Sequence, residues 1–545
     1  MAIRNEAQLS TRWRMMLTML GIVGSRGRRP LAGEGAARVG CSRGALRTGI
    51  GEADGIRAAR SLLPRQWAMA VLVAMLSTAL PAAGALAQPV VTDVFPPEEY
   101  AARRAKVMTA IGDAVAILQG TTERPGEQPL RQSNQFHYLS GVVAPRALLI
   151  IDGRTRRSTL FLQPETERRV MVMFGPLLEP GDSAARVTGM NAVLPREEFA
   201  AALERLARDG RTIYAPFRPE VLGSASAGDV IRLAKATRED PWDGRVSREE
   251  SFIAHLRERS PRSEIRDLDP IVDTLRATKS AREIAVIREA TRITGLGIME
   301  AMRDARPGMH EYELQAAAEY VFKKHGSYGA AYFALVATGR NTFYTHYHAN
   351  TARLAKGDLV QFDYAPDYRN YTSDVTRVFP ADGMFTPWQR ELYTIYLRLY
   401  RALLTSIRVH ATPREIVADA VVKMDSIMKS YHFTDPKIRD AAARFVERYR
   451  ESTPNALGHT IGMEVHDVRL PTPTLEPGQL FTIEPQMTLP EEHLGIRLED
   501  VILMTANGYE NLSEFVPIEV EDIERLMAER GFSDSALRMP GEPVP

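Results

Sequence analysis

The sequence predicts two folded parts, an α/β part followed by an α+β part with an antiparallel sheet. Three observations lead to this prediction. Strand-like apolar runs alternate with helical patterns up to about residue 235. A helix-rich stretch then covers residues 268–326, and beyond it strand-like runs and turns dominate. The chain has 545 residues, 44% hydrophobic and 25% charged, which is enough for more than one core.

The α/β part begins with an amphipathic helix pattern, "PEEYAARRAKVMTAIG", after Pro96. Four short aliphatic runs that stop at Gly, Pro or Asp predict buried strands: "DAVAILQG", "ALLIIDG", "STLFLQP" and "TIYAP". The pattern "REEFAAALERLARDG" predicts a helix between them. The polar and charged stretch 235–262 is read either as a linker or as an insertion.

In the α+β part, helical patterns at 386–409 and 413–430 interrupt the strand-like runs. Those runs are "GDLVQFDYAP", "TSDVTRVFP", "QLFTIEPQM" and "GIRLEDVILMT". We therefore expect an N-terminal domain over 88–262 and a second domain over 268–530.

The first 66 residues form a basic leader with twelve arginines and four acidic residues. Since the whole chain has a net charge of +1, the remainder is net negative. It lacks the basic excess expected of a nucleic-acid-binding protein. The single cysteine, Cys41, also lies in this leader, so neither disulfides nor thiol chemistry are expected in the body of the protein.

Residues 67–87 have the pattern of a signal peptide, with an apolar stretch that ends in the cleavage signal "ALA" before Gln88. The alternative is a transmembrane helix, which Pro81 and Gly84 disfavour. We expect export to the periplasm or outside the cell, without a stable membrane anchor after cleavage. A start codon further along, at Met69 or an earlier residue, would account for the long leader.

Two aspartates lie in apolar segments of "VQFDYAPDYRNYTSDVTRVF", which reads as two strands around a turn. An ionised carboxylate there is costly unless it is paired or bound to a metal. A hairpin would bring Asp363 and Asp374 to within about 5 Å, where a divalent cation could hold both. Taken alone, a surface hairpin with exposed aspartates explains the pair better.

Further polar groups in similar contexts change that balance. His459 and His466 lie in "GHTIGMEVHD", Glu484 lies in "FTIEPQM", and Glu499 lies in "GIRLEDVILMT". The order Asp363, Asp374, His459, Glu484, Glu499 resembles the metal ligands of the pita-bread metallopeptidases, which include methionine aminopeptidase, Xaa-Pro aminopeptidase (aminopeptidase P) and prolidase. The resemblance covers about 268–525, and "RQSNQFHYLSGVVAPRALLIID" is similar to the N-terminal domain of aminopeptidase P.

The resemblance implies a creatinase/aminopeptidase (pita-bread) domain with a curved, mainly antiparallel sheet and two divalent metal ions. Asp374 and Glu499 would bridge the ions, Asp363 would complete one, and His459 with Glu484 the other. Four carboxylates and one imidazole suit Mn²⁺, which the resemblance favours, while Zn²⁺ and Co²⁺ remain open.

The resemblance also implies catalytic roles. His346 in "FYTHYHAN" and His466 match histidines that contact the substrate, whereas His348 is expected to be structural. Glu484 is the expected proton shuttle as well as a ligand. Arg497 matches an arginine that supports the site. The plainer alternatives are an exposed loop histidine at 346 and a surface charge at 497.

These residues together predict an exported Xaa-Pro aminopeptidase that acts on proline-containing peptides and forms dimers or tetramers. Prolidase, which cleaves only dipeptides, and a non-catalytic peptide-binding protein are the alternatives. One departure bears on proline specificity: Asn455 stands where the resembling enzymes have a histidine, and an amide cannot carry a proton charge.

Overall fold

The computed structural model describes residues 94–123, 130–164, 178–221, 226–451 and 457–532, all within one compact unit. The predicted leader, the predicted signal peptide and Asn455 lie outside these residues. No helix among the described residues is both long and apolar enough to span a membrane.

The chain from 94 to 267 builds a six-stranded sheet with the order β4-β3-β2-β1-β5-β6. Strands β1, β2 and β3 pair antiparallel, whereas β4, β5 and β6 join parallel to their neighbours. The strands are β1 (Val115–Gln119), β2 (Leu148–Asp152), β3 (Arg157–Leu162), β4 (Ala192–Pro195), β5 (Ile213–Ala215) and β6 (Ile265–Asp267). The helices are α3 (Pro97–Ile111), α4 (Asn134–Ser140), α6 (Asp182–Thr188), α7 (Phe199–Arg208), α8 (Ala227–Glu239) and α9 (Arg248–Arg259).

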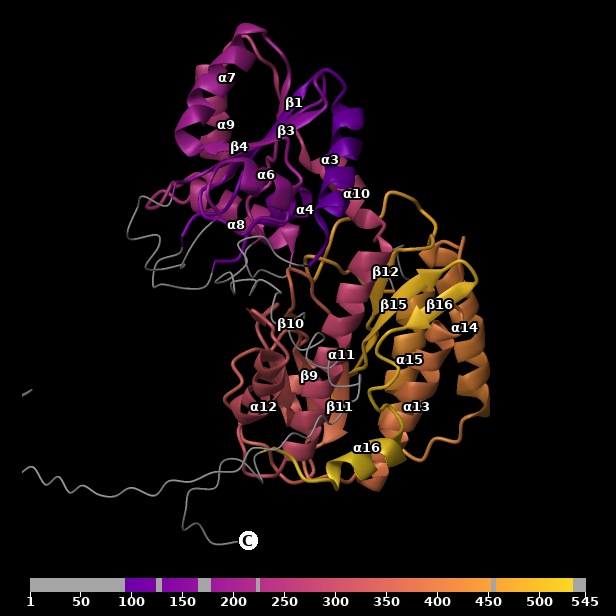
Figure 1. Cartoon of the computed structure of the whole chain (residues 1–545). Helices are drawn as coiled ribbons and strands as arrows, with labels where there is room; N and C mark the ends of the chain where they lie inside the picture. Colours follow the sequence, from indigo (N-terminus) through magenta and orange to yellow (C-terminus); the bar gives the residue numbers. More distant parts are fainter. Residues whose placement is uncertain (1–93, 124–129, 165–177, 222–225, 452–456, 533–545) are drawn as a thin grey trace, which may run out of the picture. The chain divides into compact units, whose positions relative to one another are not determined.

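Alternation along the strands gives this sheet two apolar faces. Val115 and Ile117 of β1 pack with residues of α7 and α9, whereas Ala116 and Leu118 belong to the cluster that includes α3 and α4. In Figure 1, α7 and α9 lie on one side of β1 and α3 lies on the other. The predicted α/β architecture is therefore confirmed as a sheet between two helical layers.

The charged stretch 235–262 is neither a linker nor a separate insertion. Leu256 of α9 is buried in the sheet's core, and β6 adds a sixth strand after it. Ser247 begins α9 because its hydroxyl accepts a hydrogen bond from the Glu250 amide. The polar composition of this stretch wrongly suggested a segment outside the fold, because α9 buries only one narrow face and leaves the rest at least partly exposed to solvent.

Every strand pair from 329 to 511 is antiparallel, as the sequence predicted. The pairs form small sheets with the orders β10-β7, β11-β9-β8, β12-β15-β16 and β13-β14. The strands are β7 (Gly329–Ala330), β8 (Leu335–Thr338), β9 (Leu359–Asp363), β10 (Pro366–Asp367), β11 (Thr376–Pro380), β12 (Leu480–Ile483), β13 (Gln486–Leu489), β14 (Leu494–Arg497), β15 (Asp500–Thr505) and β16 (Gly508–Asn511).

Local signals account for several helix starts in this part of the chain. Thr386 and Thr412 form capping boxes and precede prolines at the first helical position. The sequence analysis missed α15, although Asp435 and Pro436 give it the same kind of start. The helices are α10 (Asp269–Ala277), α11 (Ala281–Asp304), α12 (Glu311–Lys324), α13 (Pro387–Leu404), α14 (Pro413–Ser430), α15 (Pro436–Arg450) and α16 (Val520–Met527).

Candidate metal centre

The five predicted ligands all lie at the ends of strands or in the loops beside them. Asp363 is the last residue of β9, whereas Asp374 lies two residues before β11, not inside a strand as predicted. Glu484 separates β12 from β13, and Glu499 separates β14 from β15. His459 lies in the loop before β12.

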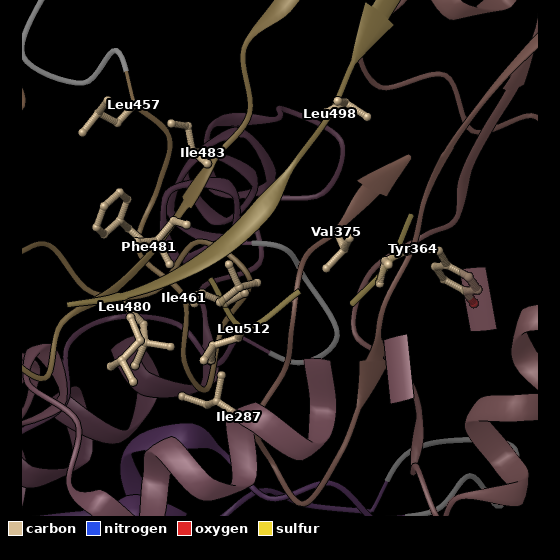
Figure 2. Packing of buried hydrophobic residues seen from close by; sticks show 14 of the residues in the cluster. Ile287, Tyr364, Val375, Leu457, Ile461, Leu480, Phe481, Ile483, Leu498 and Leu512 are labelled. Atoms are coloured by element: carbon tan, nitrogen blue, oxygen red, sulfur yellow. The ribbon is translucent and has the colours of Figure 1, made fainter. Parts of the chain in front are cut away.

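The predicted carboxylate ligands Asp363, Asp374 and Glu499 each have a buried hydrophobic neighbour in the sequence. Tyr364 follows Asp363, Val375 follows Asp374, and Leu498 precedes Glu499; all three neighbours are 2% exposed or less. Figure 2 shows these neighbours among the packed residues of the core. Since successive residues of an extended chain point to opposite sides, packing of the neighbour turns the carboxylate the other way, toward a shared site.

The ligands do converge. One ligand atom from each of Asp374, His459 and Glu499 lies within 4.8 Å of the others. Nε2 of His459 is 3.4 Å from Oδ2 of Asp374 and 3.2 Å from Oε1 of Glu484. The hydroxyl of Tyr332 lies 2.6 Å from Oδ1 of Asp363 and 2.7 Å from Oδ1 of Asp374, which brings the fifth group to the same place.

The electrostatics of this group call for a cation. Burial, and after it the charge of Asp363, raises the pKa of Asp374 well above its ordinary value. Burial and the charge of Asp374 do the same to the pKa of Glu499. Oε1 of Glu499 is buried and accepts no hydrogen bond from any of the residues that the structure describes. A divalent cation bound by oxygen ligands would satisfy that atom and relieve the repulsion, so the residues fit a divalent metal site.

Three residues around the ligands orient them. Thr376 donates a hydrogen bond to Glu499, and Arg497 forms an ion pair with Asp363 while its Nε reaches Thr376 at 3.3 Å. Tyr332 holds the two aspartates as described above. The sequence analysis named Arg497 but missed Tyr332 and Thr376, because neither stands out from its apolar surroundings in the sequence. Arg497 is 1% exposed, so it acts on the ligands and does not face the solvent.

The predicted active-site histidines differ in their surroundings. The His466 ring stacks on that of the ligand His459 with 3.7 Å between centroids. Burial, followed by the charge of His459, lowers the pKa of His466 to about 4. His346 is exposed and also lowers the pKa of His466, so its ring lies within electrostatic reach. His348 bonds to the carbonyl of His346 and packs against Phe333.

Comparison with known proteins agrees with this geometry. Residues 285–506 match the model of metallopeptidase family M24, and residues 100–214 match that of the aminopeptidase P N-terminal domain. The Xaa-Pro aminopeptidase of Escherichia coli K12 is 30% identical over 456 residues, covering 79% of this chain and 97% of the relative.

Solved structures give the same result. Proline aminopeptidase P II from Yersinia pestis superposes with a TM-score of 0.63 at 31% identity, over 80% of this chain and all of that one. Zinc-substituted E. coli aminopeptidase P in complex with product has a TM-score of 0.63 at 29% identity, over 79% of this chain and 98% of that one. The resemblance drawn from the sequence is confirmed over both parts of the fold.

Proposed function

The chain belongs to metallopeptidase family M24 and is a metal-dependent aminopeptidase, and we propose that it removes the residue that precedes proline at the N-terminus of peptides. The observation that carries this proposal is the convergence of Asp374, His459 and Glu499 within 4.8 Å. An Xaa-Pro bond lacks an amide hydrogen and its proline ring restricts the backbone, so a dedicated site is reasonable.

We propose a dinuclear site in which Asp363 would hold one ion, His459 and Glu484 would hold the other, and Asp374 and Glu499 would serve both. The two ions would lower the pKa of a water and polarise the scissile carbonyl. Mn²⁺ is the proposed native metal because carboxylate-rich sites favour it over softer ions. Reconstitution with Mn²⁺, Zn²⁺ and Co²⁺, followed by elemental analysis and assay, tests the choice.

The protein groups divide the remaining work. Glu484 is the most exposed ligand, with 25% of its side chain accessible, and its Oε1 accepts a hydrogen bond from Thr482. It can therefore take a proton from water and pass it to the leaving nitrogen. His466 and the exposed His346 contact the substrate and stabilise charge that develops on the carbonyl oxygen. Arg497 holds Asp363 and screens the carboxylates from one another.

We also propose three features of the protein outside the metal centre: the curvature of its sheets, its assembly and its export. We propose that the small antiparallel sheets from β8 to β16 follow one curve, and that the protein assembles as a dimer or tetramer. It is exported after cleavage before Gln88. Sedimentation of the purified protein tests the assembly, and N-terminal sequencing of the protein recovered outside the cytoplasm tests the export.

The activity is tested by hydrolysis of matched tripeptides Xaa-Pro-Yaa and Xaa-Ala-Yaa in the presence of Mn²⁺. Release of Xaa from the proline peptide alone is the expected result. Asp374→Asn should abolish it. Asp435→Asn is the matched control, because Asp435 caps α15 and accepts a hydrogen bond from the Trp388 indole, contacts that involve none of the predicted ligands, and asparagine caps equally well. Equal hydrolysis of the alanine peptide would contradict proline specificity.

The tripeptide Xaa-Pro-Yaa also distinguishes an aminopeptidase from a prolidase. A prolidase would leave the tripeptide intact and would cleave only the dipeptide Xaa-Pro. The relatives reported above are aminopeptidases, and the match to the aminopeptidase P N-terminal domain favours the longer substrate. Asn455→His tests the departure from the related enzymes. If the side chain at this position contributes to the recognition of proline, the imidazole should raise kcat/KM for proline peptides.

A further inference from the structure

The loop that carries His466 is held by buried ion pairs on both sides of that histidine in the sequence. Glu464 and Asp467 flank His466, and both carboxylates bind Nη2 of Arg276, at 3.0 Å and 2.5 Å. Nζ of Lys279 lies 3.0 Å from the other oxygen of Asp467. All four side chains are 1% exposed.

Such a network fixes one geometry. Burying four charges costs free energy that close pairing offsets, so a movement of the loop that breaks one of these pairs would be costly. Although burial alone would raise it, the charges of Arg276 and Lys279 hold the pKa of Asp467 below its ordinary value. A Cβ at Gly462 would lie 2.1 Å from Oδ2 of Asp467, so the loop closes tightly on its own carboxylate.

The loop is fastened from the metal side as well. The Thr372 amide, close to the ligand Asp374, donates to the carbonyl of Gly462 at 2.9 Å, and the amide of Asp467 donates to the carbonyl of Thr460. Between these anchors the His466 ring rests on that of His459. A shift of the anchors would therefore move His466 relative to the ligand beneath it.

The network of hydrogen bonds continues into residues 131–135, "RQSNQ", which have no role in the proposed function. Nδ2 of Asn134 donates to Oε1 of Glu464 at 3.1 Å, and Nη1 of Arg276 donates to Oε1 of Gln135 at 3.2 Å. Arg131 in turn donates to Oδ1 of Asn134 and to the carbonyl of Met463. Residues of α4 thereby reach the backbone and side chains beside His466.

We propose that Arg276 is a positioning residue for catalysis, which holds His466 over the metal centre through Glu464 and Asp467 and makes the N-terminal α/β part a component of the active site. This inference rests on the proposed function. It predicts that Arg276 acts only through His466, whereas a merely structural arginine would affect activity whether or not His466 is present.

A double-mutant cycle on the full-length, metal-loaded enzyme tests the proposal. Arg276→Met should lower kcat for Xaa-Pro-Yaa about ten- to hundredfold while metal content per chain stays unchanged. In the His466→Ala background the same change should lower kcat less than about twofold, because the group that it positions is gone.

Arg104→Met is the matched control. Arg104 is equally buried, but it bonds to Ser158 and to the carbonyls of Leu139 and Gly189, far in sequence from the loop. Its effect on kcat should be the same factor in both backgrounds. An equal loss from Arg276→Met in both backgrounds, or no loss at all, would overturn the proposal. Inactive wild-type enzyme would instead reject the proposed function.

Two milder variants keep the test decisive if Arg276→Met does not fold. Glu464→Gln preserves the shape of the side chain and leaves Asp467 paired with Arg276 and Lys279. Asn134→Ala removes the hydrogen bond to Glu464 and the one that Asn134 accepts from Arg131, and it leaves both ion pairs of Arg276 in place. Both should lower kcat in a manner that depends on His466, and the absence of such a loss in both would overturn the proposal.

Discussion

The hydroxyl of Thr376 donates a hydrogen bond to Oε2 of Glu499 across 2.7 Å, joining residues 123 positions apart. This bond fixes one carboxylate oxygen of Glu499, while the other, Oε1, has no hydrogen-bond partner among the described residues. The carboxylate is thus oriented before any metal binds, and because an oxygen that accepts one hydrogen bond keeps a second lone pair, both oxygens stay available to metal ions. Loss of a group that orients a ligand in this way typically lowers metal affinity or activity about 10- to 100-fold.

Thr376→Val should lower metal affinity about tenfold, because it keeps the shape of the side chain and removes the hydroxyl that holds Glu499. Metal titration by calorimetry measures the change. Thr294→Val is the control, since that buried hydroxyl only bonds to the carbonyl of Ala290 within its own helix. Unchanged affinity for Thr376→Val would show that Glu499 is positioned by other contacts.

Removal of metal should lower the thermal stability of the protein. The carboxylates of the centre repel one another when they are buried without a cation, and a metal that binds only the folded state stabilises it. The gain is about 2.7 kcal/mol at a free metal concentration 100 times Kd. Melting curves with chelator and with added Mn²⁺ measure it. Asp374→Asn should abolish the response to metal, and a full response in that variant would contradict the ligand assignment.

His466→Ala should lower kcat about hundredfold without changing the metal content. The ring stacks on that of His459, a proposed ligand, but His466 is not in the group of Asp374, His459 and Glu499, whose atoms converge. Kinetics and elemental analysis on the same preparation measure both quantities. His432→Ala, which changes a histidine outside the site, serves as the control. Loss of metal together with activity would identify His466 as a ligand.

Glu249 should make folding stability depend on pH. Burial, and then the charge of Glu220, raises its pKa from an ordinary 4.5 to about 7. The folded state therefore holds the proton more tightly, and this contribution, full below pH 4.5, is lost as the pH rises through 7. Glu249→Gln should raise the free energy of unfolding by at most about 3 kcal/mol at pH 8 and little at pH 4.

Denaturant unfolding at both pH values measures this effect. Glu250→Gln, on the same helix, is the control because its side chain is exposed and pairs with Arg238 at the surface. Its change should stay within about 0.5 kcal/mol at either pH. A Glu249→Gln variant that is less stable at pH 8 than the wild type would show that the ionised carboxylate is favourable in the fold.

Gly462→Ala should reduce both stability and activity, because its Cβ would meet Oδ2 of Asp467 at 2.1 Å. The clash pushes apart the loop and the carboxylate that Arg276 and Lys279 hold. Gly228→Ala is the control: its Cβ would meet only Oγ of Ser226, at 3.7 Å. Within helix α8 that change should be neutral or stabilising by about 0.5–1 kcal/mol. Thermal melts and assays of both variants test the contrast.

Much of the fold followed from local patterns. The capping boxes at Thr386 and Thr412 mark helix starts because the hydroxyl and the residue three positions later satisfy free backbone amides. Strands β1, β2 and β3 followed from aliphatic runs. The interpretation of 235–262 as a linker or an insertion was wrong because composition does not show how apolar residues are arranged on a helix. Leu256 lies on the side of α9 that packs against the sheet.

The sequence by itself determined the family, the order of the five ligand residues and the closeness of Asp363 to Asp374, because each depends on a short motif or on one hairpin. Only the tertiary structure decided the contacts of Tyr332 with both aspartates, the bond from Thr376 to Glu499, and the reach of Arg276 to the loop of His466. These contacts join residues 31 to 191 positions apart. No periodicity or turn signal links such residues, and burial, which raises the pKa of Asp374 and of Glu499, exists only once the chain has folded.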